Sequence, residues 1–219
     1  IELSKLIEFE PDIDSYLAYL RHLCVPADST GNKNIKKLEP GQFIRIDKNG
    51  KISKKIYWDP FTFSVNHDLN EKNVVEELDR LLNESVEYRK VSDVEVGLFL
   101  SGGLDSSLLG KLMKQNSDSS LKAFNVDFEE NFEGYKGELK EARFASSEIG
   151  INLNEEKINF DNFKEIFDNY AYYQDDLVGD EVGIPLYFLG KSSRSSGIKV
   201  VLVGEGSDEL FYGYDHWNR

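Results

Sequence analysis

The segment at 101–106, Ser-Gly-Gly-Leu-Asp-Ser, constrains the fold of this chain more than any other part of the sequence. It follows an apolar run, Val96–Leu100, and precedes a helical pattern that starts near Ser106. This order predicts a short buried strand, a tight glycine loop and then the N-terminus of a helix. Unpaired N–H groups and the positive dipole at such a terminus favour an anion, so the loop is a candidate phosphate site. Asp105 adds a carboxylate where Mg²⁺ on a phosphate would need an oxygen ligand.

Two familiar phosphate-binding patterns are absent from this loop. No lysine follows Gly103, which excludes the Walker type of P-loop. Gly102 and Gly103 are adjacent, and the dinucleotide-binding pattern G-x-G-x-x-G does not allow this. The loop instead resembles the pyrophosphate loop of ATP pyrophosphatases, which split ATP into AMP and pyrophosphate. The alternative is an ordinary glycine turn with a serine cap.

From residue 71 onward, helical patterns alternate with apolar runs. Helices are expected from 71, after Ser106, at 139–149 with Gly150 as the cap, at 163–170 and at 185–195, and strands at 96–101, 121–128, 152–158 and 198–203. Such alternation predicts an α/β fold, a parallel sheet with helices on both faces. Ligands bind at the carboxyl ends of the strands in such sheets, and the loops at 101–106 and 204–208 both lie there.

The first part of the chain, residues 1–66, lacks this alternation. A helical pattern at 13–20 is followed by a turn-rich loop at 25–32. Gln42–Ile46 and Lys51–Trp58 flank an Asn-Gly pair, which predicts a β-hairpin. We therefore expect residues 1–66 to be the edge of a β-rich domain with a linker, and residues 67–219 to be a separate α/β domain.

A second glycine loop follows the last predicted strand. Residues 204–209 read Gly-Glu-Gly-Ser-Asp-Glu, and the glycines let the backbone approach a ligand. Glu205 and Asp208 could face the same pocket as Asp105, and carboxylates beside a phosphate site need cations, of which Mg²⁺ is the usual partner of ATP. The alternative is a solvated acidic turn that caps a helix through Ser207 and Asp208.

Charge and cysteine content restrict the other functions. The formal net charge of −14 argues against nonspecific binding to nucleic acid or an anionic membrane, and it also suits an ordinary soluble surface. The single cysteine, Cys24, excludes an internal disulfide, favours a reducing compartment and is expected to be a buried thiol. No membrane span or signal peptide is visible, so a cytoplasmic protein is expected.

The two loops together resemble one family. Leu-Ser-Gly-Gly-Leu-Asp-Ser-Ser at 100–107, Gly-Glu-Gly-Ser-Asp-Glu-Leu-Phe at 204–211 and the following Gly213-Tyr214 are similar to the synthetase domain of glutamine-hydrolysing asparagine synthetases. That family includes β-lactam and carbapenam synthetases and amidotransferases of surface-polysaccharide synthesis. Residues 26–58 resemble the end of its glutaminase domain. The resemblance implies an adenine nucleotide alpha hydrolase-like, Rossmann-like domain at 67–219, preceded by a β-rich remnant of a glutaminase domain at 1–66.

The resemblance also implies a role for each candidate site residue. Leu100, Ser101 and Val126 would hold the adenosine, and the pyrophosphate would be cradled by Ser101, Gly102, Gly103 and Ser106. Asp105 and Asp208 would hold Mg²⁺. Glu205 would lie at the carboxylate being activated, where it orders the site or assists proton transfer. The family usually has serine before Gly204, whereas this chain has Val203, which keeps a backbone contact to the nucleotide but removes a hydroxyl.

The implied reaction is adenylation of a carboxylate by ATP, followed by attack of ammonia from glutamine to form an amide. The acidic segment 174–180 resembles the polysaccharide-type members more than the aspartate enzymes. The resemblance therefore implies a small-molecule or sugar carboxylate as the acceptor and argues against aspartate. Asp176 and Asp180 are alternatively solvated loop acids. The resemblance is also compatible with a homodimer.

Two expected parts of the family are absent. Its glutaminase nucleophile is an N-terminal cysteine, whereas this chain starts with Ile1, and its catalytic lysine lies beyond Arg219. We therefore expect a fragment that neither hydrolyses glutamine nor completes amidation alone. A nucleotide-binding module without catalysis, or another ATP pyrophosphatase such as a tRNA-thiolating or GMP-forming enzyme, are the alternatives.

Overall fold

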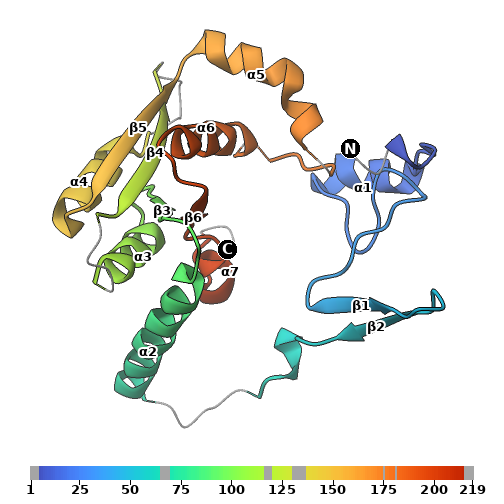
Figure 1. Ribbon diagram of the computed structural model, residues 1–219, viewed down its shortest axis with the longest axis horizontal. Coiled ribbons are helices and arrows are strands. Elements are labelled where there is room, and N and C mark those ends of the chain that lie inside the picture. Colours follow the sequence, from blue (N-terminus) through green and yellow to red (C-terminus); the bar gives the residue numbers. More distant parts are fainter. Residues whose placement is uncertain are drawn as a thin grey trace. The chain divides into compact units, whose positions relative to one another are not determined.

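The computed structural model describes residues 5–64, 70–115, 120–129, 137–174, 176–180 and 182–214. It divides into two compact units (Figure 1). The first combines Ile1–Leu69 with Phe167–Glu181, and the second combines Asn70–Ile166 with Val182–Arg219. The predicted boundary after residue 66 lies near the first break between the units. No pattern in the sequence indicated that residues 167–181 leave the α/β part. The assignment of a glutaminase-like and a synthetase part to residues 1–66 and 67–219 stays a prediction.

Four parallel strands form the sheet of the second unit. They are β3 (Val96–Phe99), β4 (Lys122–Phe128), β5 (Asn152–Ile158) and β6 (Val200–Leu202), in the spatial order β5-β4-β3-β6. The parallel pairing and the helices between successive strands confirm the predicted α/β fold. The chain steps outward from β3 to β4 and β5, and then returns to place β6 on the other side of β3.

One face of this sheet is covered by α3 (Leu104–Gln115) and α4 (Leu139–Ile149), with α2 (Glu71–Lys90) against α3. The buried core on this side consists of Val86, Leu98, Leu100, Leu112, Met113, Leu121, Ala123, Ala142 and Ala145. A Cβ on Gly110 would lie 2.8 Å from Leu98 Cδ2, so α3 approaches the sheet this closely only because glycine stands there.

The other face is covered by α6 (Gly183–Ser195), which packs against β4 and β5. Figure 1 shows α6 and α4 on opposite sides of these strands. Phe124, Phe188 and Ile198 are almost wholly buried but lie outside the core of the α3 face. Helices therefore cover both faces, as the alternating pattern predicted.

Local sequence signals fix several helix ends. Gly150 ends α4 in the left-handed conformation, with φ +73°, as predicted. Asn70 caps α2 by accepting a hydrogen bond from the Asn73 N–H. The helix α5 (Phe160–Tyr173) begins earlier than the predicted residue 163, because Asn159 and Asn162 each accept the other's backbone N–H at 2.9 Å.

The first unit contains α1 (Ile13–His22), a hairpin of β1 (Gln42–Ile46) and β2 (Ile52–Ile56), and the short 3₁₀ helix η2 (Pro60–Thr62). The two strands pair antiparallel around the turn that ends at Gly50, which has φ +77°, so the predicted hairpin is confirmed. That hairpin is the sheet of this unit as far as the structure describes it. The expectation of a β-rich remnant therefore stays a prediction.

Residues from the distant segment 176–179 pair with the end of α1 in this unit. Cys24 forms an antiparallel bridge with Val178, and the Gly179 N–H donates to the Leu23 carbonyl at 2.7 Å. Cys24 is exposed, so the expectation of a buried thiol is wrong. The physical reason is its position directly after Leu23, whose left-handed backbone ends α1 at the surface.

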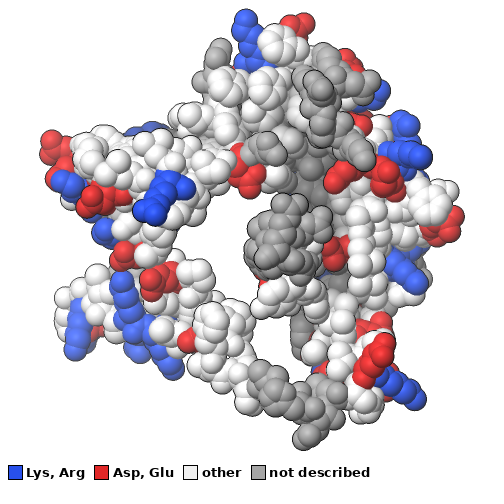
Figure 2. Space-filling view, turned by 180° about the vertical axis from the view of Figure 1, so that it is seen from behind, with Lys and Arg blue, Asp and Glu red and all other residues white. Residues whose placement is uncertain are grey.

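Basic and acidic side chains are interspersed on the face seen in Figure 2, and neither sign forms a single continuous field there. Over the described ranges, no helix combines the length and the apolar character that crossing a bilayer requires.

Candidate functional site

The two glycine loops follow neighbouring strands of the sheet. β3 leads into the loop at 100–103, and β6 leads into the loop at 203–206. The two strands pair directly, with Leu98 opposite Leu202. Because the pairing is parallel, both loops leave the sheet at its carboxyl edge. The direction in which successive strands are added also reverses between β3 and β6, and ligands of open α/β sheets bind at such switch points.

The first loop ends where α3 begins, at Leu104 rather than near the predicted Ser106. The difference arises because the Gly103 carbonyl already accepts the Ser107 N–H at 3.1 Å, which closes the first helical turn. No acceptor from the described residues meets the N–H groups of Leu104, Asp105 and Ser106. These three donors lie at the positive end of the α3 dipole, an arrangement that favours an anion, and binding of phosphate there stays a prediction.

Two serine hydroxyls bridge this loop. Ser101 Oγ and Ser106 Oγ lie 2.9 Å apart, within hydrogen-bonding distance. The Gly103 N–H donates to Ser101 Oγ at 3.2 Å, and Ser106 Oγ donates to the Gly103 carbonyl at 3.4 Å. The loop therefore holds its shape through its own side chains. It also brings together the four residues expected to cradle a pyrophosphate.

Gly102 lies against the first turn of α4. Its φ is +88°, a conformation that residues with a Cβ rarely adopt. A Cβ at this position would also collide with the backbone of Glu141 and Ala142. The glycine is thus required twice, for the turn of the loop and for its close approach to α4.

The second loop touches the first. A Cβ on Gly204 would lie 3.0 Å from the Ser106 N and 3.2 Å from the Asp105 Cβ. Ser207 Oγ donates to the Gly204 carbonyl at 3.1 Å, which ties the loop to the start of α7 (Ser207–Phe211). Gly204 thus lies directly beside the first turn of α3, as a shared binding site requires.

The candidate carboxylates lie on both sides of this contact. Asp105 is in the first turn of α3 and Asp208 is in the first turn of α7. The Asp208 carboxylate lies against Gly213, where a Cβ would collide with it. A hydrogen bond from the Tyr214 hydroxyl to Glu209 raises the pKa of Tyr214, and burial and the charges of Glu209, Asp208 and Glu205 add to the shift. The charges of Glu205 and Asp208 therefore both affect the same side chain, that of Tyr214.

These carboxylates fit a magnesium ion that is bound together with phosphate. Among the residues that the structure describes, no three Asp, Glu, His or Cys side chains converge closely enough to hold a metal alone. Mg²⁺ in nucleotide sites is usually held by one or two carboxylates together with phosphate oxygens and water. The placement of Asp105 beside three unpaired N–H groups suits that arrangement.

The residues expected at the nucleotide lie in or directly after three neighbouring strands. Leu100 directly follows β3 and is 1% exposed, Val126 is in β4, and Val203 directly follows β6. β4 runs on to Phe128, whereas its pairing with β3 ends at Phe99. The backbone around Val126 therefore extends along the carboxyl edge beside the loop at 100–103.

Sequence reasoning missed two polar groups next to these loops. Asn125 is 5% exposed, and its side-chain amide donates to the Leu100 carbonyl at 2.9 Å. Its only signal in the sequence is a neutral amide in the middle of an apolar strand. Glu138 directly precedes α4, and burial together with the charges of Glu141 and Asp127 raises its pKa. The surroundings of the loop are thus acidic.

The acidic segment 174–180 belongs to the first unit, as do the residues of α5 from Phe167 onward. Asp176 forms an ion pair with Lys37 at 2.6 Å, and Lys37 also donates to the Val25 carbonyl at 2.8 Å. Asp176 is therefore a paired, half-buried acid rather than a solvated one. Asp175 lies outside the described residues, and the approach of Asp180 to an acceptor stays a prediction.

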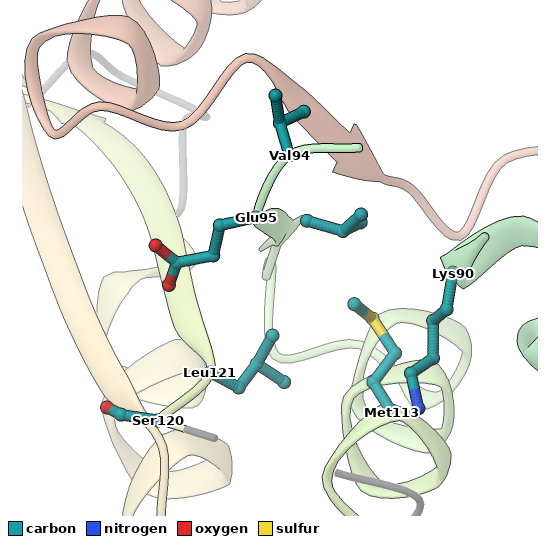
Figure 3. A pocket seen from close by; sticks show the side chains of 7 residues that line it. Lys90, Val94, Glu95, Met113, Ser120 and Leu121 are labelled. Carbon is teal, nitrogen blue, oxygen red and sulfur yellow. The ribbon is translucent and has the colours of Figure 1, made fainter. Parts of the chain in front are cut away.

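A cavity of about 200 Å³ lies at the opposite edge of the sheet, where the strands begin (Figure 3). Lys90, Glu95, Met113 and Leu121 line it. Its volume is below the range of about 300–1,000 Å³ that is typical of small-molecule sites. The cavity is thus separate from the glycine loops, which lie at the carboxyl edge.

Comparison with known proteins identifies similar chains. The family model for asparagine synthase matches residues 77–219. Glutamine-hydrolyzing asparagine synthetase 1 of Bacillus subtilis is 34% identical over 208 residues, which cover 95% of this chain and 32% of that protein. Putative glutamine-hydrolyzing asparagine synthetase 2 of Methanocaldococcus jannaschii is 33% identical over 192 residues, covering 87% and 36%. Amidase chyE of Penicillium rubens is 29% identical over 198 residues, covering 84% and 29%.

The chain spans about a third of the length of these curated relatives. Among solved structures, glutamine-dependent NAD+ synthetase from Acinetobacter baumannii in complex with ADP is 18% identical, with a TM-score of 0.43 over 75% of this chain and 32% of that chain. A likeness at that level is too low to bear on function.

Proposed function

Because the chain belongs to the asparagine synthase family, we propose that it forms the ATP-binding part of an amidotransferase that activates a carboxylate with ATP and converts it into an amide. The observation that carries the proposal is the contact between the two glycine loops. Gly204 contacts Ser106 and Asp105 at the switch point of the sheet. The N–H donors for a pyrophosphate and the loop that carries Glu205 and Asp208 therefore lie next to each other.

The first loop would hold the pyrophosphate end of ATP. The three unpaired N–H groups at the start of α3 point to an anion, and the hydroxyls of Ser101 and Ser106 can turn their mutual hydrogen bond toward phosphate oxygens. The adenosine would lie along the carboxyl edge, against Leu100, Val126, Val203 and Gly204.

Asp105 and Asp208 are the residues that would hold Mg²⁺. Bound there, the ion would neutralise the negative charge on the pyrophosphate as it departs. Glu205 would orient the acceptor or move a proton at its reacting group. Because Asp105 and Asp208 belong to helices that follow different strands, this role needs both loops in place.

In the proposed reaction, a carboxylate oxygen of the acceptor attacks the α-phosphorus of ATP. A new P–O bond forms, the bond to the β-phosphate oxygen breaks, and pyrophosphate leaves. Ammonia then attacks the acyl carbon of the adenylate, loses a proton, and releases AMP with the amide. The donors at the α3 terminus would stabilise the charge that develops on the leaving pyrophosphate.

The partners of the whole protein are part of the proposal. Glutamine is the source of ammonia through a glutaminase domain, and the acceptor is a small-molecule or sugar carboxylate. The resemblance of the segment 174–180 to polysaccharide-type members supports a sugar acid over aspartate. The single cysteine supports a cytoplasmic protein, and a homodimer is its proposed assembly.

The first test is binding of Mg·ATP to the chain by calorimetry. Asp105→Ala should abolish binding, whereas Asp161→Ala should leave it unchanged. Asp161 is the matched control because it occupies the first turn of α5, the same helical position outside the glycine loops. Equal binding by both variants would place the nucleotide elsewhere.

The second test concerns the reaction class. In the complete reading frame, supplied with ATP, glutamine and candidate acids, amide formation should accompany release of AMP and pyrophosphate. Release of ADP and phosphate alone would contradict carboxylate adenylation. Tight ATP binding without release of either product would favour the module without catalysis.

A further inference from the structure

Asn125 is a buried polar residue that the roles above leave unused. It lies in β4 on the side of the sheet that α3 and α4 cover, since Ala123, two residues before it, belongs to that core. Its side chain is 5% exposed, and its amide nitrogen donates to the Leu100 carbonyl at 2.9 Å. Its oxygen is buried and has no hydrogen-bond partner among the described residues.

This hydrogen bond extends the pairing of two strands beyond the end of β3. The register places Phe99 opposite Phe124, and the Leu100 N–H still donates to the Phe124 carbonyl at 2.9 Å. The side chain of Asn125 donates to the Leu100 carbonyl, so both the N–H and the carbonyl of Leu100 are hydrogen-bonded to β4. The next residue, Ser101, is the first of the pyrophosphate loop.

A buried amide with an unused oxygen is costly, because that oxygen gave up water without gaining a partner. An apolar side chain at this position would avoid the cost, but it would leave the Leu100 carbonyl unpaired at the entrance to the loop. The hydrogen bond that the Asn125 amide nitrogen donates to Leu100 therefore explains why an amide occupies this position. That donor acts on a single backbone group, from which the chain turns toward Gly102.

We infer that Asn125 is a positioning residue for the pyrophosphate loop. By holding the Leu100 carbonyl, it fixes the direction in which the chain leaves the sheet, and so the places of the N–H groups at the start of α3. This inference rests on the proposed ATP site. It adds a residue that touches no substrate and acts through the backbone of Leu100.

The chain contains a matched control for this role. Asn154 in β5 also donates its side-chain amide to a carbonyl of the neighbouring strand, at 3.1 Å to Ala123. That carbonyl belongs to the paired part of β4, away from the glycine loops. Loss of either amide should weaken the sheet, but only loss of Asn125 should disturb the loop.

The experiment compares Asn125→Leu and Asn154→Leu with the parent chain, using calorimetry with three probes: Mg·ATP, magnesium pyrophosphate and adenosine. Asn125→Leu should bind ATP and pyrophosphate about tenfold more weakly and should lose less of its affinity for adenosine. Asn154→Leu should bind all three normally. Circular dichroism and thermal unfolding measure how far each variant is destabilised.

Asn125→Asp gives a second measurement that keeps the shape of the side chain. The ionised carboxylate cannot donate to the Leu100 carbonyl, whereas the protonated acid can, and burial raises the pKa of such an acid. Its pyrophosphate affinity, relative to the parent at the same pH, should therefore recover as the solution is acidified from about pH 8 to about pH 5. This variant also carries the test if Asn125→Leu does not fold.

The outcomes separate this inference from the proposed function. Unchanged pyrophosphate binding by a folded Asn125→Leu, or an equal loss in Asn154→Leu, would overturn the positioning role while the ATP site stands. A uniform loss for adenosine and pyrophosphate would overturn it as well. If the parent binds neither ATP nor pyrophosphate, the proposed function fails and this inference fails with it.

Discussion

Gly204→Ala tests the contact on which the candidate site depends. Gly204 does not have the left-handed backbone that disfavours alanine, so the added methyl group acts through space alone. Its carbon would lie 3.0 Å from the Ser106 N and 3.2 Å from the Asp105 Cβ. Both separations are shorter than ordinary van der Waals contact, so the two loops must move apart by a few tenths of an ångström. Backbone in the first turn of a helix cannot move aside as a flexible side chain does.

The expected cost in stability is that of overpacking, about 1–3 kcal/mol. For a chain of this size, that lowers the melting temperature by about 2–4 °C per kcal/mol. Binding should suffer more specifically, because the displaced turn carries the N–H groups for the pyrophosphate and the Asp105 carboxylate. We expect Mg·ATP affinity to fall about tenfold, since a full misplacement of about 1 Å in a binding group can cost about a hundredfold.

Gly190→Ala is the matched control, because a Cβ at Gly190 meets nothing within 4 Å. Gly190 is inside α6, where alanine is favoured over glycine by about 0.5–1 kcal/mol, so this variant should melt at a slightly higher temperature. Calorimetry and thermal unfolding of both variants make the comparison. The reasoning would be refuted if Gly204→Ala bound Mg·ATP like the parent, or if it were as stable as Gly190→Ala.

Three further predictions follow from other contacts. Gly102→Ala should lose far more stability and ATP affinity than Gly150→Ala, because both glycines have positive φ but only the first would collide with backbone; melting and calorimetry of the pair test this. Lys37→Met should speed local hydrogen exchange at residues 176–179, because it leaves the half-buried carboxylate of Asp176 unpaired. Equal exchange protection in the variant and the parent would contradict a stabilising ion pair. A hydrogen bond from Arg143 lowers the pKa of Glu155 in the folded protein. The pair therefore stabilises the fold above the unfolded pKa of about 4.3, and this stabilisation is lost as the pH falls. Arg143→Gln should lower the melting temperature near about pH 7 but not near about pH 3.

The local parts of the fold could be predicted from the sequence. The apolar run before Ser101, the glycine after α4 and the Asn-Gly pair in the hairpin each fix a structure within a few residues of themselves. The parallel sheet followed from the alternation of strands and helices, and its carboxyl edge from the direction of the strands. The observed elements differ from the predicted ones at their ends. For example, α3 begins at Leu104, earlier than predicted, because the Gly103 carbonyl already accepts a helical hydrogen bond.

The parts that could not be predicted depend on partners far apart in the chain. Nothing near β6 specifies that it pairs with β3 rather than with the outer edge of β5. Likewise, the bridge of Cys24 to Val178 joins segments without a shared pattern, and it exposes a thiol that composition alone favoured as buried. The bond from Asn125 to Leu100 needs the register of two strands before it becomes visible.

The place of β6 beside β3 has a consequence for the order of folding. β3, β4 and β5 can pair with the strand that follows or precedes them in the chain, through short connections, whereas β6 must close a much longer loop to reach β3. We expect the neighbours to assemble first and β6 to dock last. Until β6 docks, Gly204 is remote from Ser106, and the chain has only the first of the two glycine loops in place. Nucleotide would then bind only to molecules whose sheet is complete, so that ligand stabilises the last step of assembly by mass action.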